Sequence, residues 1–141
     1  MTSDDATDHG MERTAYQEWH GLEMYTDDEG VTHATIPYDE KLTNPFGVVN
    51  GSVIGTLVDV ASGKALRETF ADPESSMLAT VDLNVTYLDA ATDDLHGEIT
   101  IVYAGGSIGV TRAEVTCPGP DGEPNPVAVG QTIYRLFRES T

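Results

Sequence analysis

One long helical stretch, from residue 52 to about residue 70, most constrains what this chain can fold into. Its apolar residues recur three or four positions apart, at Ile54, Leu57, Val58, Ala61 and Ala65. Asn50 or Ser52 can serve as the N-cap, and Asp72-Pro73 is typical of a helix end. No other segment predicts a helix of comparable length, so we expect the rest of the chain to form strands around it.

Six further segments have the composition and alternation of β-strands. They are residues 22–26, 31–37, 77–88, 95–104, 108–117 and 127–137, and a short helix is expected over residues 11–20. Segment 80–88 has apolar residues at alternate positions: Val81, Leu83, Val85 and Tyr87. This alternation predicts one face that packs on the helix and an opposite, polar face that includes Thr80. The Gly- and Pro-rich segment 118–126 is expected to be a long turn.

Composition bounds the class of protein. The 141 residues suffice for one domain with a real core, and we expect a disordered acidic N-terminus at 1–10 and a single domain over 11–141. The 24 acidic and 7 basic residues give a net charge of −17, so neither nucleic acid nor an anionic membrane surface is an expected partner. The chain lacks an apolar run of membrane-helix length and a signal-peptide pattern, and Cys117 is its single cysteine, which together favour a cytoplasmic location.

The acidic residues are spread along the chain rather than gathered in one tail, and only two residues are lysines. Such a composition favours a halophilic source, because in concentrated salt the Debye length falls to roughly 3 Å and self-repulsion is screened. An ordinary acidic protein is the alternative.

Asp59 is the most informative residue of the helix chemically. Its neighbours one turn away on either side are small: Gly55, Thr56, Ser62 and Gly63. A ligand or another backbone could therefore approach the carboxylate closely. Upstream, Asn44 adds an amide donor to the positive end of the helix dipole, which suits a polarised carbonyl or an oxyanion. The combination predicts attack on an acyl group, with a solvated Asp on a small-residue packing face as the alternative.

The order of these residues is similar to a family pattern. The spacing Asn-x-x-Gly-x-x-x-Gly-x-x-x-x-x-x-x-Asp is formed by Asn44, Gly47, Gly51 and Asp59. Together with the strand segments Thr80–Leu88 and Val127–Tyr134, it makes the chain from about residue 12 to 137 resemble the hotdog-fold acyl-CoA thioesterases of the phenylacetate-pathway (PaaI-type) group. The resemblance implies an α+β hotdog fold, in which an antiparallel six-stranded sheet wraps around one long central helix.

The resemblance also implies roles for single residues. The Gly51 N–H and Asn44 would polarise the thioester carbonyl, Asp59 would act as base or nucleophile, and Thr80 would hold the water. Three further residues are expected to bind substrate: Asn50, Ser52 and Phe46. The family usually has His-Gly-Gly where this chain has Asn50-Gly51-Ser52, so any role that needs a titrating imidazole is lost.

The predicted function is hydrolysis of an acyl-CoA thioester to a free acid and CoA, without metal or cofactor. Two alternatives stay open: a hotdog domain that binds acyl-CoA or a related acyl ligand without turnover, and a hydratase or dehydratase, which would need an Asp/His pair. The resemblance implies a homodimer or a dimer of dimers with its seam at residues 80–88. There Asp59 and Thr80 of one subunit would meet Asn44 and Gly51 of its mate.

Two kinds of ligand site lack a sequence signal. The turn Gly105-Gly106-Ser107 carries no Lys or Arg, where family members often have a basic residue. The candidates for binding the CoA phosphates are therefore basic residues scattered along the chain: Arg112, Arg135, Arg138, Lys64 and Arg67. The four histidines, at positions 9, 20, 33 and 96, show no ligand spacing, so no metal site is predicted.

Overall fold

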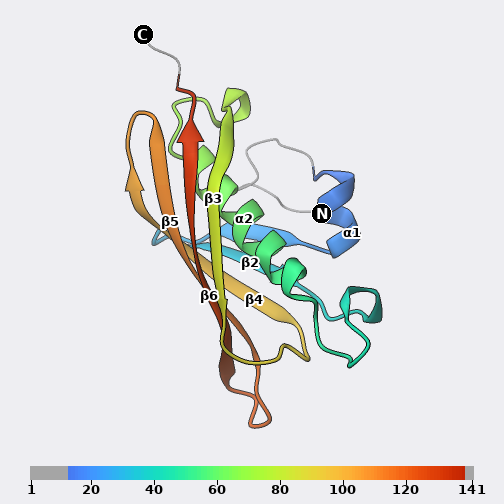
Figure 1. The fold of residues 1–141 in the computed structure, drawn as a ribbon. Helices are drawn as coiled ribbons and strands as arrows, with labels where there is room; N and C mark the ends of the chain where they lie inside the picture. Colours follow the sequence, from blue (N-terminus) through green and yellow to red (C-terminus); the bar gives the residue numbers. More distant parts are fainter. Residues whose placement is uncertain (1–12, 139–141) are drawn as a thin grey trace.

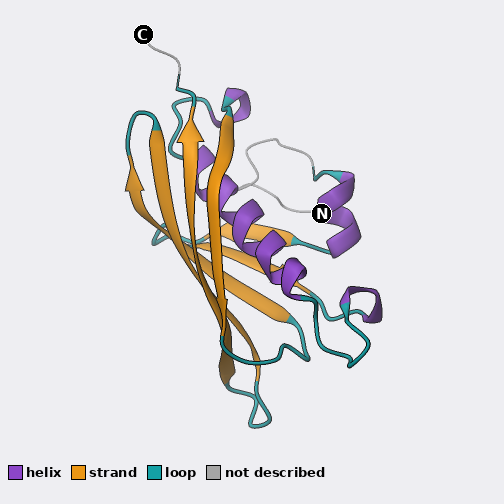
Figure 2. Cartoon of the chain, viewed as in Figure 1, coloured by secondary structure: helices purple, strands orange, loops and turns teal. Residues whose placement is uncertain are grey.

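The structure is a computed structural model that describes residues 13–138, so the expected disorder of residues 1–10 lies outside the described residues. All six strands belong to one antiparallel sheet in the order β1-β2-β4-β5-β6-β3. The sheet curves around the long helix α2 (Figure 1), and the helices lie on the concave side of the sheet (Figure 2). The predicted arrangement, an antiparallel six-stranded sheet around one long helix, is confirmed.

The elements have the following bounds. The helices are α1 (Ala15–His20) and α2 (Gly51–Arg67), with short 3-10 turns at Glu40–Leu42 and Pro73–Ser75. The strands are β1 (Glu23–Thr26), β2 (Thr32–Ile36), β3 (Leu78–Tyr87), β4 (Leu95–Ala104), β5 (Ile108–Pro118) and β6 (Pro124–Leu136). Because β5 and β6 pair as far as Pro118 and Pro124, the turn predicted over residues 118–126 is shorter than expected.

Helix α2 is held by its apolar stripe, whose members Leu57, Val58 and Ala61 are fully buried against the sheet. Two glycines on the sheet let the helix approach closely. A Cβ at Gly97 on β4 would overlap the Leu57 side chain, and a Cβ at Gly109 on β5 would lie 2.6 Å from a Leu66 methyl carbon. The helix is therefore seated by small residues of the strands as well as by its own apolar face.

The loop before α2 is closed by Asn44. Its side-chain oxygen Oδ1 accepts hydrogen bonds from the backbone N–H groups of Phe46 and Val48, at 2.9 and 3.1 Å. Gly47 completes the turn with a φ of 77°, in the left-handed region that glycine tolerates. Asn50 occupies the N-cap position of α2, as predicted, but its side chain makes no capping bond and donates instead to the Leu42 carbonyl.

Strand β3 departs from the simple alternation that its sequence predicts. In the pairing with β6, Thr80 lies opposite Tyr134 but Asp82 lies opposite Ile133, so Val81 is an extra residue in a β-bulge. The bulge shifts the phase of the strand by one residue. Thr80 faces α2 and Val81 is 62% exposed, so the predictions that Val81 packs on the helix and that Thr80 lies on the opposite face are wrong.

Strand β3 is also an edge of the sheet, with its outer side unpaired among the described residues. Large apolar side chains on this strand are exposed, notably Val81, Leu83 and Tyr87, and so is Leu88 directly after it. Among residues 13–138, no helix combines the length and apolar character that crossing a bilayer requires.

Candidate active site

The Asp59 side chain lines a cleft between α2 and the edge strand β3. The cleft has a volume of about 490 Å³ and is lined by Tyr16, Ser52, Gly55, Thr56, Asp59, Val60, Leu83, Val85 and Tyr87. Its rim includes α1, because the Tyr16 hydroxyl lies 2.7 Å from the Thr56 hydroxyl. Thr56 donates its own proton to the Ser52 carbonyl, so Tyr16 is the donor to Thr56.

Two hydroxyl groups hold one oxygen of the Asp59 carboxylate. Thr80 Oγ1 donates to Asp59 Oδ1 at 2.8 Å, and the Tyr134 hydroxyl lies 2.7 Å from the same oxygen and 2.6 Å from the Asp59 backbone carbonyl. No donor among the described residues binds the other oxygen, Oδ2. The carboxylate is therefore fixed in orientation while one of its oxygens stays available for chemistry.

Register explains why the two hydroxyls meet on Asp59. Thr80 and Tyr134 are directly opposite each other across β3 and β6, and the bulge at Val81 creates that pairing. Gly63, one turn after Asp59, leaves room for the phenol, because a Cβ there would lie 3.1 Å from the Tyr134 oxygen.

Tyr134 is the partner of Asp59 that the sequence analysis missed. It is 4% exposed. Burial raises the pKa of its phenol well above the ordinary value, and the neighbouring Asp59 carboxylate adds to the rise. The phenol is therefore neutral and a hydrogen-bond donor at physiological pH. Its sequence signal was faint: a tyrosine in the closing strand, and a glycine one turn after the helix carboxylate.

The N-terminus of α2 carries Gly51, whose N–H was predicted to polarise the carbonyl. Gly51 is the first residue of the helix and is exposed, and the first amides of a helix have no acceptor in the preceding turn. The Tyr87 hydroxyl donates to the Gly51 carbonyl at 2.7 Å, and a Cβ at Gly51 would lie 3.1 Å from the Tyr87 ring. Only glycine fits here without displacing that ring.

The structure brings some predicted site residues together and not others. Asp59 and Thr80 are in contact, and Ser52 lines the same cleft. Gly51 precedes Asp59 by eight residues on one helix, which separates them by about 12 Å at a rise of roughly 1.5 Å per residue. One acyl group cannot bridge that distance within a single chain.

The remaining predicted residues lie in the loop before α2 and do not line the cleft. Phe46 is 88% exposed. The Asn44 side-chain oxygen faces its own loop, and both the backbone N–H and the Nδ2 of Asn50 donate to the Leu42 carbonyl.

Two of the basic residues considered for phosphate binding have clear positions. Arg138 lies against the turn that lacks a base of its own: its Nε donates to the Gly105 carbonyl at 2.9 Å, and its other nitrogens bind Thr69. Lys64 is 4% exposed and pairs with Glu68 at 2.7 Å, so its ammonium group lies in a buried ion pair.

Known proteins are similar to this chain in sequence and in fold. Residues 46–122 match the Thioesterase superfamily. A protein of Halobacterium salinarum named "Putative esterase" is 37% identical over 150 residues, with 99% of each chain covered. A thioesterase family protein from Silicibacter pomeroyi has a similar structure, with a TM-score of 0.81, 23% identity, and coverage of 90% of this chain and 92% of that one. The BH2602 protein of Bacillus halodurans, solved with CoA, gives a TM-score of 0.80 at 22% identity, over 96% of this chain and 86% of that one.

The family match spans more than half of the chain, and the Halobacterium relative matches almost all of it. The two solved structures share the fold of this chain over at least nine-tenths of its length. The chain therefore belongs to the thioesterase superfamily and has the hotdog fold.

Proposed function

We propose that this protein hydrolyses acyl-CoA thioesters to a free acid and CoA, with Asp59 as the reacting carboxylate. The observation that carries the proposal is the Asp59 side chain, which has one oxygen held by Thr80 and Tyr134 and the other free beside a cleft. Membership of the thioesterase superfamily supports the reaction class. The CoA bound to the Bacillus halodurans protein supports CoA as the carrier of the acyl group.

The chemistry needs only groups that the fold supplies. As a base, Asp59 takes a proton from water while the water oxygen attacks the thioester carbon, and Thr80 orients that water. Negative charge on the carbonyl oxygen is stabilised by the Gly51 N–H at the helix start and by Asn44. The C–S bond then breaks and the CoA sulfur takes up a proton. As a nucleophile, Asp59 would instead attack the thioester carbon, the C–S bond would break to release the CoA thiolate, and water would then cleave the resulting anhydride to free the acid and restore the carboxylate.

The working unit in this proposal contains two chains. Gly51 and Asp59 are about 12 Å apart along one helix, so they serve one carbonyl only if they come from different copies. The exposed apolar edge of β3 supports this arrangement, because native proteins avoid leaving such strand edges unpaired. A homodimer through residues 80–88, alone or as a dimer of dimers, would bring Asp59 and Thr80 of one subunit to Asn44 and Gly51 of the other.

Substrate contacts follow from the positions of the remaining predicted residues. The apolar wall formed by Val60, Leu83 and Val85 suits an acyl chain, and Ser52 lines the same cleft. Phe46, on the exposed loop, and Asn50 keep their proposed roles at the substrate of the joint site. Arg138 beside Gly105 replaces the basic residue that the turn lacks, as a contact for CoA phosphates.

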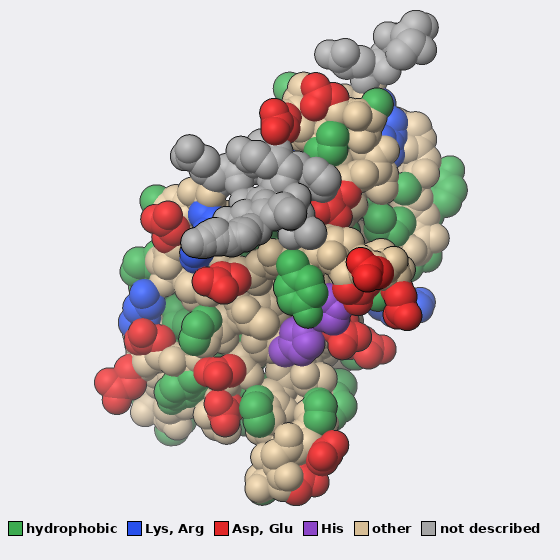
Figure 3. Space-filling view, turned by 180° about the vertical axis from the view of Figure 1, so that it is seen from behind, with side chains coloured by type: hydrophobic (Ala, Val, Ile, Leu, Met, Phe, Trp, Pro, Cys, Tyr) green, Lys and Arg blue, Asp and Glu red, His purple; other side chains and the backbone are tan. Residues whose placement is uncertain are grey.

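We place this activity in a salt-rich cytoplasm. Acidic side chains are scattered over the visible face of the molecule with few basic ones among them (Figure 3), and the curated relative comes from Halobacterium salinarum. Assays of the protein therefore belong in molar salt as well as in dilute buffer.

The decisive test is the Asp59→Asn variant in a thiol-release assay across a panel of aromatic and aliphatic acyl-CoA substrates. Turnover should fall by about 10² or more with the fold intact, because the amide keeps the shape but cannot take a proton or attack. Asp28→Asn, which changes the same charge in the exposed β1–β2 turn, is the matched control and should keep full turnover. Near-wild-type turnover of Asp59→Asn would remove Asp59 from the mechanism.

A non-catalytic acyl-CoA-binding domain is the second candidate, and the observation that favours it is Asn50 where the family usually has His. The bonds from Asn50 to the Leu42 carbonyl support a role in ordering the loop, which needs no titrating group. If the protein is a hydrolase and Asn50 only orders the loop, Asn50→His should change turnover only a few-fold. If the parent is inactive on the whole panel and Asn50→His gains activity, the protein is a binding domain.

A further inference from the structure

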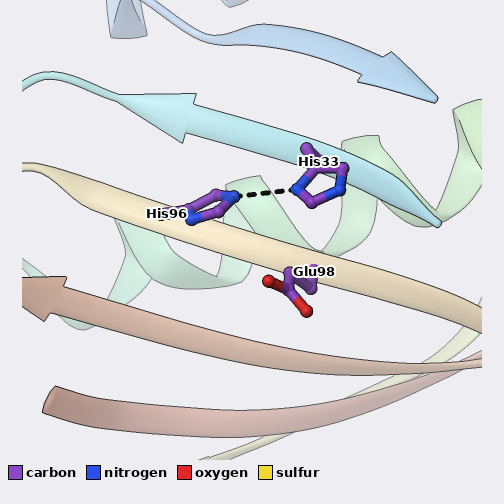
Figure 4. A group of neighbouring side chains, drawn as sticks. All are labelled: His33, His96 and Glu98. Carbon is purple, nitrogen blue, oxygen red and sulfur yellow. Dashed lines mark hydrogen bonds between the residues drawn. The ribbon is translucent and has the colours of Figure 1, made fainter. Parts of the chain in front are cut away.

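A cluster of metal-ligating side chains lies on the face of the sheet that points away from α2. His33 on β2 is directly opposite Glu98 on β4, and His96 is two residues along β4 on the same face. One ligand atom from each of the three lies within 4.8 Å of the others. Figure 4 shows the three side chains on the same side of the two strands, with α2 behind them. The thioester chemistry proposed above uses none of these groups.

The hydrogen bonds of His33 determine which ring nitrogens carry protons. Its Nε2 lies 2.8 Å from Asp27 Oδ2, and a carboxylate can only accept, so Nε2 carries the hydrogen. In the neutral ring the other nitrogen, Nδ1, is therefore unprotonated. It lies 3.0 Å from Nε2 of His96, which must then be the donor. An imidazole lone pair of His33 is thus directed at a nitrogen of His96.

The separation of these two nitrogens is close to that of two ligands on one metal ion. Zn–N bonds of about 2.0–2.1 Å at a tetrahedral angle place their nitrogens about 3.3 Å apart, against 3.0 Å here. Metal binding requires this separation to widen by a few tenths of an ångström and the two rings to turn so that both lone pairs converge on the ion, together with exchange of the His96 proton from Nε2 to Nδ1 through solvent. Glu98 is exposed and can turn its carboxylate in as a third ligand.

Asp27 holds His33 in the orientation that such a ligand needs. The other carboxylate oxygen of Asp27 accepts the backbone N–H groups of Glu29 and Val31, at 2.9 and 3.0 Å, so the carboxylate itself is fixed by the hairpin turn. The Tyr25 ring stacks on His33, with centroids 4.7 Å apart and planes 8° from parallel. A carboxylate on the far nitrogen of a metal-bound histidine is the usual supporting contact in metal sites.

We infer that His33 Nδ1, His96 Nε2 and Glu98 form a binding site for one divalent transition-metal ion of the Zn²⁺ or Co²⁺ type. Two imidazoles and one carboxylate select such ions over Mg²⁺ and Ca²⁺, which prefer oxygen ligands. Three protein ligands leave a fourth position for water. Because the ligands come from neighbouring strands, bound metal also links β2 to β4 and stabilises the folded chain.

The test is titration of the metal-free full-length protein with Co²⁺, followed by visible absorption and by calorimetry, in molar KCl with excess Mg²⁺. The salt and the Mg²⁺ mask weak binding of cations to the many surface carboxylates. We expect one Co²⁺ per chain, displaced by Zn²⁺, and a rise in Tm on binding. His96→Gln should weaken binding at least a hundredfold, Glu98→Gln about tenfold, and Asp27→Asn by 10–100-fold.

Matched variants separate this site from other metal-binding groups of the chain. His9→Gln removes an imidazole outside the described residues, and Glu74→Gln removes an exposed carboxylate elsewhere; both should bind Co²⁺ like the parent. His96→Gln is the most informative variant, because it leaves the bond between His33 and Asp27 in place. The inference is overturned if the parent shows no saturable one-to-one binding at micromolar Co²⁺, or if His96→Gln, folded by circular dichroism, binds as tightly as the parent.

Discussion

Asp59 is held by hydroxyl groups rather than by a cationic side chain. Both of its partners, Thr80 and Tyr134, are neutral hydroxyls. A carboxylate positioned by hydroxyl donors keeps its orientation in concentrated salt, where exposed charge pairs are screened. At the scale of the residue, the site is therefore suited to the ionic conditions that the surface composition predicts.

The contribution of Tyr134 can be measured by removing its hydroxyl. Tyr134→Phe should lower turnover by about 10–100-fold, because a hydrogen bond to a charged group contributes roughly 1.5–3 kcal/mol. Thiol release measures the effect, and Tyr103→Phe, at an exposed tyrosine of β4, should be silent. Equal turnover of Tyr134→Phe and the parent would leave Thr80 as the sole hydroxyl that matters to Asp59.

Stability against pH gives a second readout of the same phenol. The folded-state pKa of Tyr134 is raised above the ordinary value of 10.0. Its contribution to stability is therefore fully present below pH 10 and is lost as the pH rises through the folded-state pKa. Denaturant unfolding of the parent minus that of Tyr134→Phe should show a difference that is constant below pH 10 and shrinks above it.

The sequence predicts this site in part. Asp59 and Thr80 were expected together and lie 2.8 Å apart, whereas their catalytic roles stay predictions. Tyr134 could not be predicted, because it comes from 75 positions further along the chain and nothing in its own segment marks the phenol as a partner. His33 and His96, 63 positions apart, were missed for the same reason: strand pairing, rather than local spacing, brings them together.

At the scale of the element, α2 and the strands follow from periodicity, but the phase of β3 does not. A valine at position 81 fits a regular strand as well as a bulge, so the alternation alone assigned the wrong face to Thr80. The turn expected at 118–126 is shorter than predicted because Pro118 and Pro124 lie at the ends of paired strands instead of interrupting them.

The close packing of α2 on the sheet predicts how one added methyl group, at Gly97, changes the stability of the fold. Gly97→Ala should destabilise the fold by about 1–3 kcal/mol, because the added Cβ overlaps Leu57, which is fully buried and cannot move aside. Denaturant unfolding measures the loss. Gly106→Ala, where nothing lies within 4 Å of the new Cβ, is the control and should be neutral. An unchanged midpoint for Gly97→Ala would mean that helix and sheet can separate at no cost.

At the scale of the whole molecule, the edge strand β3 predicts assembly. Val81→Lys places a charge on the exposed edge and should convert the proposed dimer to a monomer with at least a hundredfold loss of turnover, since each site of the proposed dimer draws on two chains. Light scattering in molar salt and thiol release are the two measurements. Val102→Lys, at a valine of the interior strand β4 that is 52% exposed against 62% for Val81, should leave both unchanged. An active compact monomer of the parent would contradict the shared site.

The bulge at Val81 also bears on how relatives of this chain are aligned. Beyond the bulge, Leu83 pairs with Thr132, and continuing that register back along β3 would place Val81, rather than Thr80, opposite Tyr134. One inserted residue thus decides whether a valine or a hydroxyl meets the helix carboxylate, while the apolar pattern of the strand hardly changes. An ungapped alignment with a relative that lacks the insertion would match residues on opposite faces of the sheet, so the correct alignment carries a one-residue gap at Val81.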